Sequence, residues 1–257
     1  TSSPPSSGST AHGEATHGYL LHEETLHVPL LVRAPGLVAA GQRRSEPVSI
    51  ADLAPTLVSL AGQSIPPTMD GRPLFAASSN AAARAPYAET LYGWETARWA
   101  QMFALRRGSR KVVDAGPRVL DVDLGAAAPE DAPRTVPADA VDGDPGLAEL
   151  VATARRVGSF APLAPPAPGA DDLAGGSYWS PLGGPRATAL TPEENAGRPS
   201  PYDRMDVVQR LDRGRSLLAA GDAPGAAGAF AAALDADPAN PQAHQWRGRA
   251  LLDAGRA

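Results

Sequence analysis

Apolar residues in the first sixty positions follow two different spacings, and each spacing predicts a different element. A short apolar run closed by a Pro-Gly pair, residues 28–33, is typical of a buried strand that leaves a turn. Residues 50–61 instead carry apolar side chains at helical spacing, with Ser49 in place to cap the first turn and a glycine after the last. Residues 19–26 gather their apolar side chains on one face of a short helix. The pattern therefore predicts helix, strand and helix, preceded by a polar loop.

Further along the chain, alternating apolar and polar positions predict a small antiparallel sheet. Residues 87–92 alternate as one strand, and residues 103–113 form a hairpin that turns at a Gly-Ser pair. Residues 118–124 alternate again as a third strand. An amphipathic helix over residues 147–157 follows a stretch with few apolar side chains.

The last part of the chain holds an internal repeat. The pattern Arg-Gly-Arg-x-Leu-Leu-x-Ala-Gly occurs at residues 213–221 and again at residues 247–255, a shift of 34 residues. This is the period of tetratricopeptide repeats (TPR), which pair two antiparallel helices. Gly214 and Ala226 are small where such helices must approach, so one repeat is expected over residues 207–240. A second repeat begins after it, whereas a stable stack usually needs about three.

Three segments of the first eighty residues carry a resemblance to a known family. They read HGEATHGYLLHEETLHVPLLVRAPG at residues 12–36, PVSIADLAPTLVSLAG at residues 47–62 and DGRPL at residues 70–74. In order and spacing they resemble the C-terminal part of sulfatase-like hydrolases of the alkaline phosphatase superfamily, here fused to tetratricopeptide repeats. The resemblance implies a parent enzyme that hydrolyses sulfate or phosphate monoesters with a bound divalent metal (Ca, Mn or Zn).

The same resemblance indicates which parts of such an enzyme this sequence lacks. The family places a metal-binding Asp-His or Asp-Asn pair about a dozen residues ahead of His17, where residues 1–10 read TSSPPSSGST. The family's nucleophile motif, Cys or Ser followed by x-Pro-Ser-Arg, is missing as well. We therefore expect a C-terminal fragment that is inactive alone and binds no metal tightly.

The expected fold class is α/β, a partial sulfatase-like fold with a small antiparallel subdomain, followed by a linker and an α-helical TPR segment. With 27 Pro, 26 Gly and only 5% aromatic residues, we expect folded parts separated by flexible ones. The expected parts are disordered residues 1–11, an α/β core over 12–80, the antiparallel subdomain over 81–157, a Pro/Gly-rich linker over 158–202 and TPR helices over 203–257.

Composition narrows the possible partners. A net charge of -5 and a pI near 5.5 provide no basic footprint for nucleic acid. The absence of cysteine excludes disulfides, zinc thiolate sites and a Cys nucleophile. No apolar run approaches the roughly 20 residues of a transmembrane helix, and no export signal is visible at the amino terminus. Relatives in the family are often exported or membrane-anchored, so the sequence leaves the localisation open.

His17 is the best candidate for chemistry. The resemblance implies that it points at the transferred ester oxygen or the leaving group, and an imidazole with an unperturbed pKa near 6.5 can act there as a general acid. His12 and His17 are the expected substrate-binding residues. The alternative is a loop histidine without a catalytic partner. A metal site built from His12, Glu14 and His17 is conceivable, but nothing in the sequence orients the three, so no metal ligand is predicted.

A pair of carboxylates offers a second candidate site. Asp121 and Asp123 alternate onto one side of a predicted strand and could bind a cation, although such a pair is more often a solvated face.

Two functions remain open at this stage. The preferred one is the C-terminal fragment of a metal-dependent sulfatase-like hydrolase, whose substrate is a sulfate or phosphate ester. The alternative is a non-catalytic TPR module that binds a protein partner. The sequence does not give the substrate, the metal, the preference for sulfate over phosphate or the oligomeric state.

Overall fold

A computed structural model of the chain describes residues 13–14, 17–75, 85–127, 130–158 and 190–255. The segment expected to be disordered, most of the expected linker and His12 lie outside these residues.

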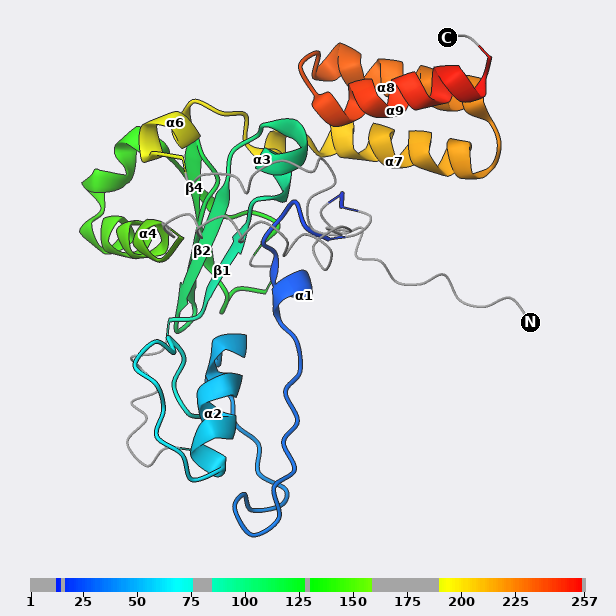
Figure 1. Cartoon of the computed structure of the whole chain (residues 1–257). Helices are drawn as coiled ribbons and strands as arrows, with labels where there is room; N and C mark the ends of the chain where they lie inside the picture. Colours follow the sequence, from blue (N-terminus) through cyan, green and yellow to red (C-terminus); the bar gives the residue numbers. More distant parts are fainter. Residues whose placement is uncertain (1–12, 15–16, 76–84, 128–129, 159–189, 256–257) are drawn as a thin grey trace, which may run out of the picture.

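The centre of the molecule is an antiparallel sheet of five strands in the order β1-β2-β3-β4-β5 (Figure 1). The strands are β1 (Tyr87–Thr90), β2 (Met102–Arg107), β3 (Arg110–Asp114), β4 (Arg118–Asp123) and β5 (Arg134–Pro137). The predicted strands and hairpin are confirmed, including the turn at Gly108, whose φ of 61° suits a glycine. Strand β5 was not predicted, because Val136 is its one aliphatic residue and the strand pairs at the edge of the sheet.

Both faces of the sheet are covered. Helix α4 (Pro145–Gly158), the predicted amphipathic helix, packs on one face, where Phe103 and Leu105 meet Leu147 and Val151. Met102 and Ala104 point to the other face, so four consecutive residues of β2 are buried. A strand covered on both sides needs apolar residues at successive positions, which explains the run MFAL.

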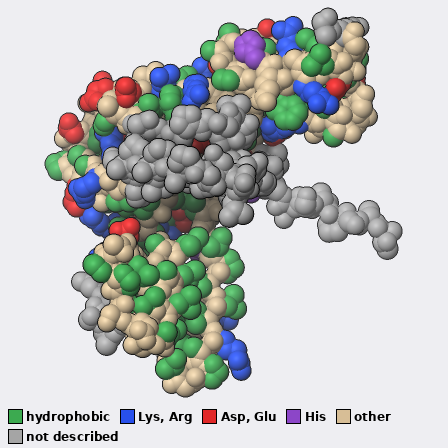
Figure 2. Space-filling view, in the orientation of Figure 1, with side chains coloured by type: hydrophobic (Ala, Val, Ile, Leu, Met, Phe, Trp, Pro, Cys, Tyr) green, Lys and Arg blue, Asp and Glu red, His purple; other side chains and the backbone are tan. Residues whose placement is uncertain are grey.

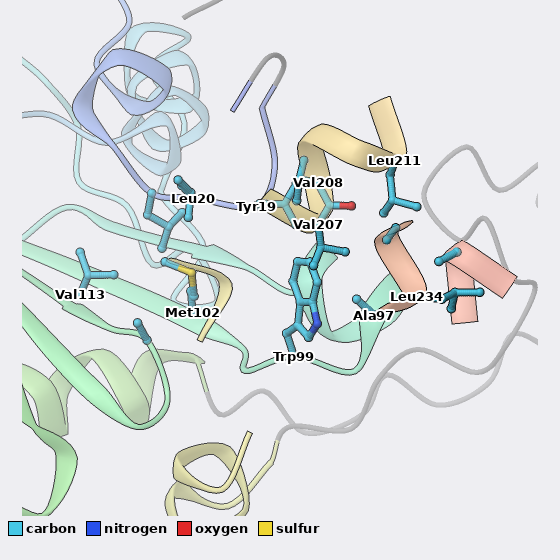
Figure 3. Close-up of a cluster of buried hydrophobic side chains, with 14 of the residues drawn as sticks. Tyr19, Leu20, Ala97, Trp99, Met102, Val113, Val207, Val208, Leu211 and Leu234 are labelled. Atoms are coloured by element: carbon cyan, nitrogen blue, oxygen red, sulfur yellow. The ribbon is translucent and has the colours of Figure 1, made fainter. Parts of the chain in front are cut away.

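The second face packs against segments from both ends of the chain. Figure 3 shows Trp99 close to Tyr19, Val207 and Ala97, the last of which ends the short helix α3 (Tyr92–Ala97). This core continues into three helices, α7 (Met205–Ala219), α8 (Ala223–Ala236) and α9 (Pro241–Asp253). The helical segment is therefore joined to the sheet by a common core.

The three helices lie where the repeat predicts them. An added Cβ at Gly214 would come within 2.4 Å of the Phe230 ring, which confirms the close approach of α7 and α8. The assignment of these helices to the TPR family stays a prediction.

Part of the expected linker is ordered. Residues 190–203 form α6 (Pro192–Ala196) and the 3-10 helix η4 (Pro201–Asp203). The backbone amide of Gln101 donates to the Asn195 side-chain oxygen at 2.8 Å, and the Asn195 side-chain amide donates to the Gln101 carbonyl at 3.0 Å. These two hydrogen bonds hold α6 beside the start of β2.

Two predictions at the amino-terminal side are wrong. The predicted helix over residues 19–26 is reduced to α1 (Glu23–Leu26), and Tyr19 to Leu21 are non-helical and buried in the core. The predicted strand over residues 28–33 does not form, and Leu31 is 88% exposed and Val28 57% exposed. Among the described residues no strand pairs with this segment, and an extended chain without a neighbour cannot satisfy its backbone as a strand.

The predicted helix over residues 50–61 does form. It begins with the 3-10 turn η1 (Ile50–Asp52) and continues as α2 (Leu53–Leu60), with Ser49 and Asp52 in a capping box. Asp52 also accepts the Arg72 amide at 2.7 Å, and this holds the turn at residues 70–74 against η1. Figure 1 shows this part of the chain as a lobe that extends away from the sheet, and Figure 2 shows many apolar side chains on its surface.

Candidate functional site

The loop that carries His17 is held closed by a buried carboxylate. Glu14 is 4% exposed and accepts the backbone amides of Tyr19 at 2.7 Å and Leu20 at 3.3 Å. Burial raises the pKa of Glu14 above its usual value, although the two amides and the nearby His17 and His22 oppose the rise. Both carboxylate oxygens are therefore engaged in shaping the loop.

Contacts to the sheet and to α7 fix the same loop from outside. The Thr90 hydroxyl donates to the Gly18 carbonyl, and the Tyr19 and Tyr92 rings meet edge to face at 4.7 Å. On the other side Gln209 donates to the Gly13 carbonyl at 3.3 Å. The loop therefore contacts the end of β1 on one side and α7 on the other.

His17 is exposed on this anchored loop. A histidine in such a position is accessible to a bound molecule. Its predicted companion His12 lies outside the described residues, so the structure does not show whether the two act together. The catalytic and substrate-binding roles of these histidines remain predictions.

The described residues do not fit a metal. No group of three or more His, Asp or Glu side chains is arranged to hold one among them. Glu14 is committed to backbone amides, and His22 is buried 3.4 Å from Glu130. We therefore derive no chemical step through a metal held by the described residues.

Behind the loop lies a buried ion cluster that the sequence did not reveal. Lys111, the single lysine of the chain, is 1% exposed and contacts Glu23 at 3.0 Å and Glu130 at 2.8 Å. His22 approaches the same Glu130, and its ring also meets Tyr202 edge to face at 5.4 Å. The cluster ties α1, β3 and the residues after β4 together.

The charges of this cluster stabilise one another. Burial opposes ionisation of Glu130, but hydrogen bonds from His22 and Lys111 and the charge of Lys111 outweigh it and lower its pKa to about 2. The available sequence signal was a lone lysine in an apolar strand of an otherwise arginine-rich chain.

Asp121 has no role as an isolated cation ligand. It accepts hydrogen bonds from Arg110 at 2.8 Å and from Arg134 at 2.6 Å, and Asp144 contacts both arginines. The Arg110 hydrogen bond lowers the pKa of Asp121 despite some burial. Asp123 instead accepts the Gly125 amide at 3.0 Å, so the two carboxylates have separate structural roles.

Comparison with known proteins supports a sulfatase-like fragment. Residues 15–109 match the family model described as N-sulphoglucosamine sulphohydrolase, C-terminal. Over 63 residues the chain is 41% identical to arylsulfatase K of Mus musculus, which covers 24% of this chain and 11% of the mouse protein. Arylsulfatase K of Xenopus laevis is also 41% identical over 63 residues, or 23% of this chain and 12% of that protein. The similarity thus concerns a small part of each relative, and no solved structure matches the chain.

The matched residues include His17, the lobe with α2, and β1 to β2, whereas Gly13 and Glu14 precede them. The three helices α7, α8 and α9 lie outside them. Among the described residues, no helix has the length and apolar character needed to cross a membrane.

Proposed function

We propose that the chain is the C-terminal part of a sulfatase-like hydrolase that acts on sulfate or phosphate monoesters. The observation that carries the proposal is the match of residues 15–109 to a sulfatase C-terminal family. The nucleophile and the ligands of a divalent metal would then come from a part of the enzyme that this chain does not contain, and the chain alone would be inactive.

The exposed apolar lobe supports this proposal. Leu31, Ile50 and Leu57 are 88%, 75% and 67% exposed, and several other large apolar side chains of residues 28–65 are also exposed. Monomeric proteins rarely leave so many neighbouring apolar residues in water, and such surfaces usually mark a contact. The remainder of the hydrolase would cover the lobe, and residues 28–33 would gain the strand partner that they lack.

In the complete enzyme His17 would protonate the leaving group or contact the ester oxygen. The loop around it supports this role, because Glu14, Thr90 and Gln209 hold the backbone in place while the imidazole stays exposed. A positioned general acid contributes typically 10²–10⁴-fold to a rate. Sulfate or phosphate transfer would place negative charge next to this ring.

An assay of the chain alone tests the claim of inactivity. It is incubated with an aryl sulfate and an aryl phosphate, each with Ca, Mn or Zn, and product release is compared with buffer. We expect no turnover above background. Turnover abolished by a chelator would contradict the assignment of the metal site to another part of the enzyme.

The surrounding coding sequence tests the assignment itself. We expect an upstream Cys-or-Ser-x-Pro-Ser-Arg motif and an Asp-containing metal motif. In that longer protein, His17→Gln should lower kcat by at least tenfold, whereas His27→Gln on the exposed end of α1 should leave kcat unchanged. An unchanged kcat for His17→Gln would remove the proposed role of His17.

A second candidate is a protein-interaction module built on α7, α8 and α9. The close packing of Gly214 against Phe230, at the position that the 34-residue repeat predicts, favours it. Further 34-residue repeats downstream, without an upstream catalytic motif, would support this module over the hydrolase.

A further inference from the structure

We propose that Arg98 and Arg198, which both stack on Trp94, form a binding site for a sulfate group of a sulfated sugar chain. The choice of a sulfated sugar rests on the proposed sulfatase-like function, whereas the anion-binding geometry stands on the structure alone.

The two arginines converge on one aromatic ring. The Cζ atom of Arg98 lies 5.1 Å from the centre of the Trp94 ring, and that of Arg198 lies 4.9 Å from it. Since both distances end at the same point, the two Cζ atoms lie within about 10 Å of each other. This upper limit is comparable to the Debye length of roughly 8 Å at physiological salt, so each positive charge acts at the position of the other with only partial screening.

Neither guanidinium has a carboxylate partner within 4 Å among the described residues. Two half-buried arginines elsewhere behave differently, since Arg110 of β3 pairs with Asp121 and Arg155 of α4 pairs with Asp114. Two neighbouring cations that have no carboxylate partner among the described residues are a favourable place for an anion to bind.

The backbone of Arg98 points to a role for its side chain. Arg98 has φ 61° and ψ 26°, and it is the single residue other than glycine with a positive φ among the described ones. Glycine is the usual residue at such a helix end, because a Cβ is unfavourable in the left-handed region. An arginine that remains in a strained conformation suggests that its side chain is needed there.

The site is also held in place. Arg198 follows α6, which Asn195 fastens to Gln101, and the Ala100 amide donates to the Pro199 carbonyl at 2.9 Å. These contacts bring Arg198 to Trp94 although about one hundred residues separate the two in sequence. A guanidinium stacked on an indole is already partly ordered and weakly hydrated, so less entropy is lost when it binds an oxyanion.

The ligand class follows from this geometry. A planar guanidinium donates two parallel hydrogen bonds to a tetrahedral oxyanion, and two such groups can serve one sulfate or two successive sulfates along a chain. The loop with His17 contacts Tyr92 at the start of α3, and Arg98 directly follows the end of that six-residue helix. At 1.5 Å per residue the two ends of α3 are roughly 9 Å apart, which a chain of a few sugar units would span.

Isothermal titration of the full chain tests the proposal. The probe is a heparin-derived oligosaccharide at low ionic strength, and the same oligosaccharide after desulfation is the reference. We expect the sulfated form to bind and the desulfated form not to bind. Equal binding of the two forms, or equally tight binding of a poly-glutamate peptide, would overturn the assignment to a sulfated sugar.

Substitutions separate a binding role from a structural one. Arg98→Gly removes the charge and also relieves the left-handed strain, so the melting temperature should stay equal or rise while the affinity falls roughly tenfold. Arg198→Ala should weaken binding by a similar factor. The control Arg213→Ala removes one positive charge from the exposed face of α7 and should change the affinity by less than about twofold, because an exposed charge outside the site acts weakly.

Two results would overturn the site. One is an unchanged affinity in both Arg98→Gly and Arg198→Ala. The other is an equal loss in Arg213→Ala, which would show non-specific attraction of the polyanion. Neither readout depends on ester hydrolysis, so the proposed function can fail in the turnover and coding-sequence tests while this site is confirmed.

Discussion

At the scale of single residues, the salt-bridge cluster around Lys111 has a direct consequence for stability. A lysine that is 1% exposed is costly unless its charge is paired, and here Glu23 and Glu130 pair it from two different segments. Because the pKa of Glu130 is lowered to about 2, this group stabilises the fold above the ordinary carboxyl pKa of 4.5. That stability is lost as the pH falls from about 4.5 toward 2.

Glu130→Gln tests this linkage. At pH 7 the variant should lose on the order of 2–3 kcal/mol of unfolding free energy, because Lys111 keeps one carboxylate instead of two. Between pH 5 and pH 2.5 its stability should fall less steeply than that of the parent chain. Urea unfolding across this pH range measures both effects.

Glu149→Gln is the matched control for the same charge change. Glu149 pairs with Arg107 on the surface, where its side chain is 64% exposed, so its loss should cost less than about 0.5 kcal/mol. If the unfolding free energy of both variants fell between pH 5 and pH 2.5 as steeply as that of the parent chain, Glu130 would not be the group responsible for the loss.

At the scale of elements, the sequence pattern predicted the helices and turns that depend on residues close together in the chain. Ser49 and Asp52 cap η1 and α2, Gly108 turns the hairpin, and Gly214 faces Phe230. The strand at residues 28–33 failed because a strand needs a partner, and the apolar run alone does not supply one. The cluster around Lys111 and the stacking on Trp94 were not predictable, because they join residues that are 88 and about 100 positions apart.

Alanine substitutions at the two repeat glycines, Gly214 and Gly248, should change the stability in opposite directions. In Gly214→Ala the new Cβ would meet the Phe230 ring at 2.4 Å, so the variant should lose about 1–3 kcal/mol of stability. In Gly248→Ala nothing lies within 4 Å of the new Cβ, so the higher helix propensity of alanine should add about 0.5–1 kcal/mol. Thermal unfolding followed by circular dichroism distinguishes them, and a loss of stability in both would mean that α9 is packed as closely as α7.

At the scale of the whole molecule, the repeat helices and the sheet share one core. Val207 and Val208 of α7 pack with Tyr19 and Trp99 in this core (Figure 3). The Trp99 indole also donates to Asp237 at 2.8 Å, just beyond the end of α8. A helical module on a free tether would not bury its first helix against the sheet. The first repeat helix is therefore held to the sheet by this shared core, while the division of the chain into domains stays a prediction.

The shared core predicts one cooperative transition. Far-ultraviolet circular dichroism, which follows the helices, and near-ultraviolet circular dichroism, which follows Trp99 and Tyr19, should give the same urea midpoint. Asp237→Ala leaves the Trp99 donor without its acceptor and should lower both midpoints together, by about 1–3 kcal/mol. Two separate midpoints in the parent chain would contradict the shared core.

The apolar lobe gives the last prediction, and it separates the chain from the enzyme that we propose it belongs to. Leu31 is 88% exposed, so Leu31→Asp should change the stability of this chain by less than about 0.5 kcal/mol and should reduce its binding of a hydrophobic dye and its self-association. Val113→Asp, a control in the 1% exposed core, should unfold the chain. In the complete hydrolase the same Leu31→Asp change should be destabilising by several kcal/mol, because the aspartate would be buried where the lobe meets the remainder of the enzyme. Equal tolerance of Leu31→Asp in both proteins would mean that the lobe stays in water and that the contact we propose does not form.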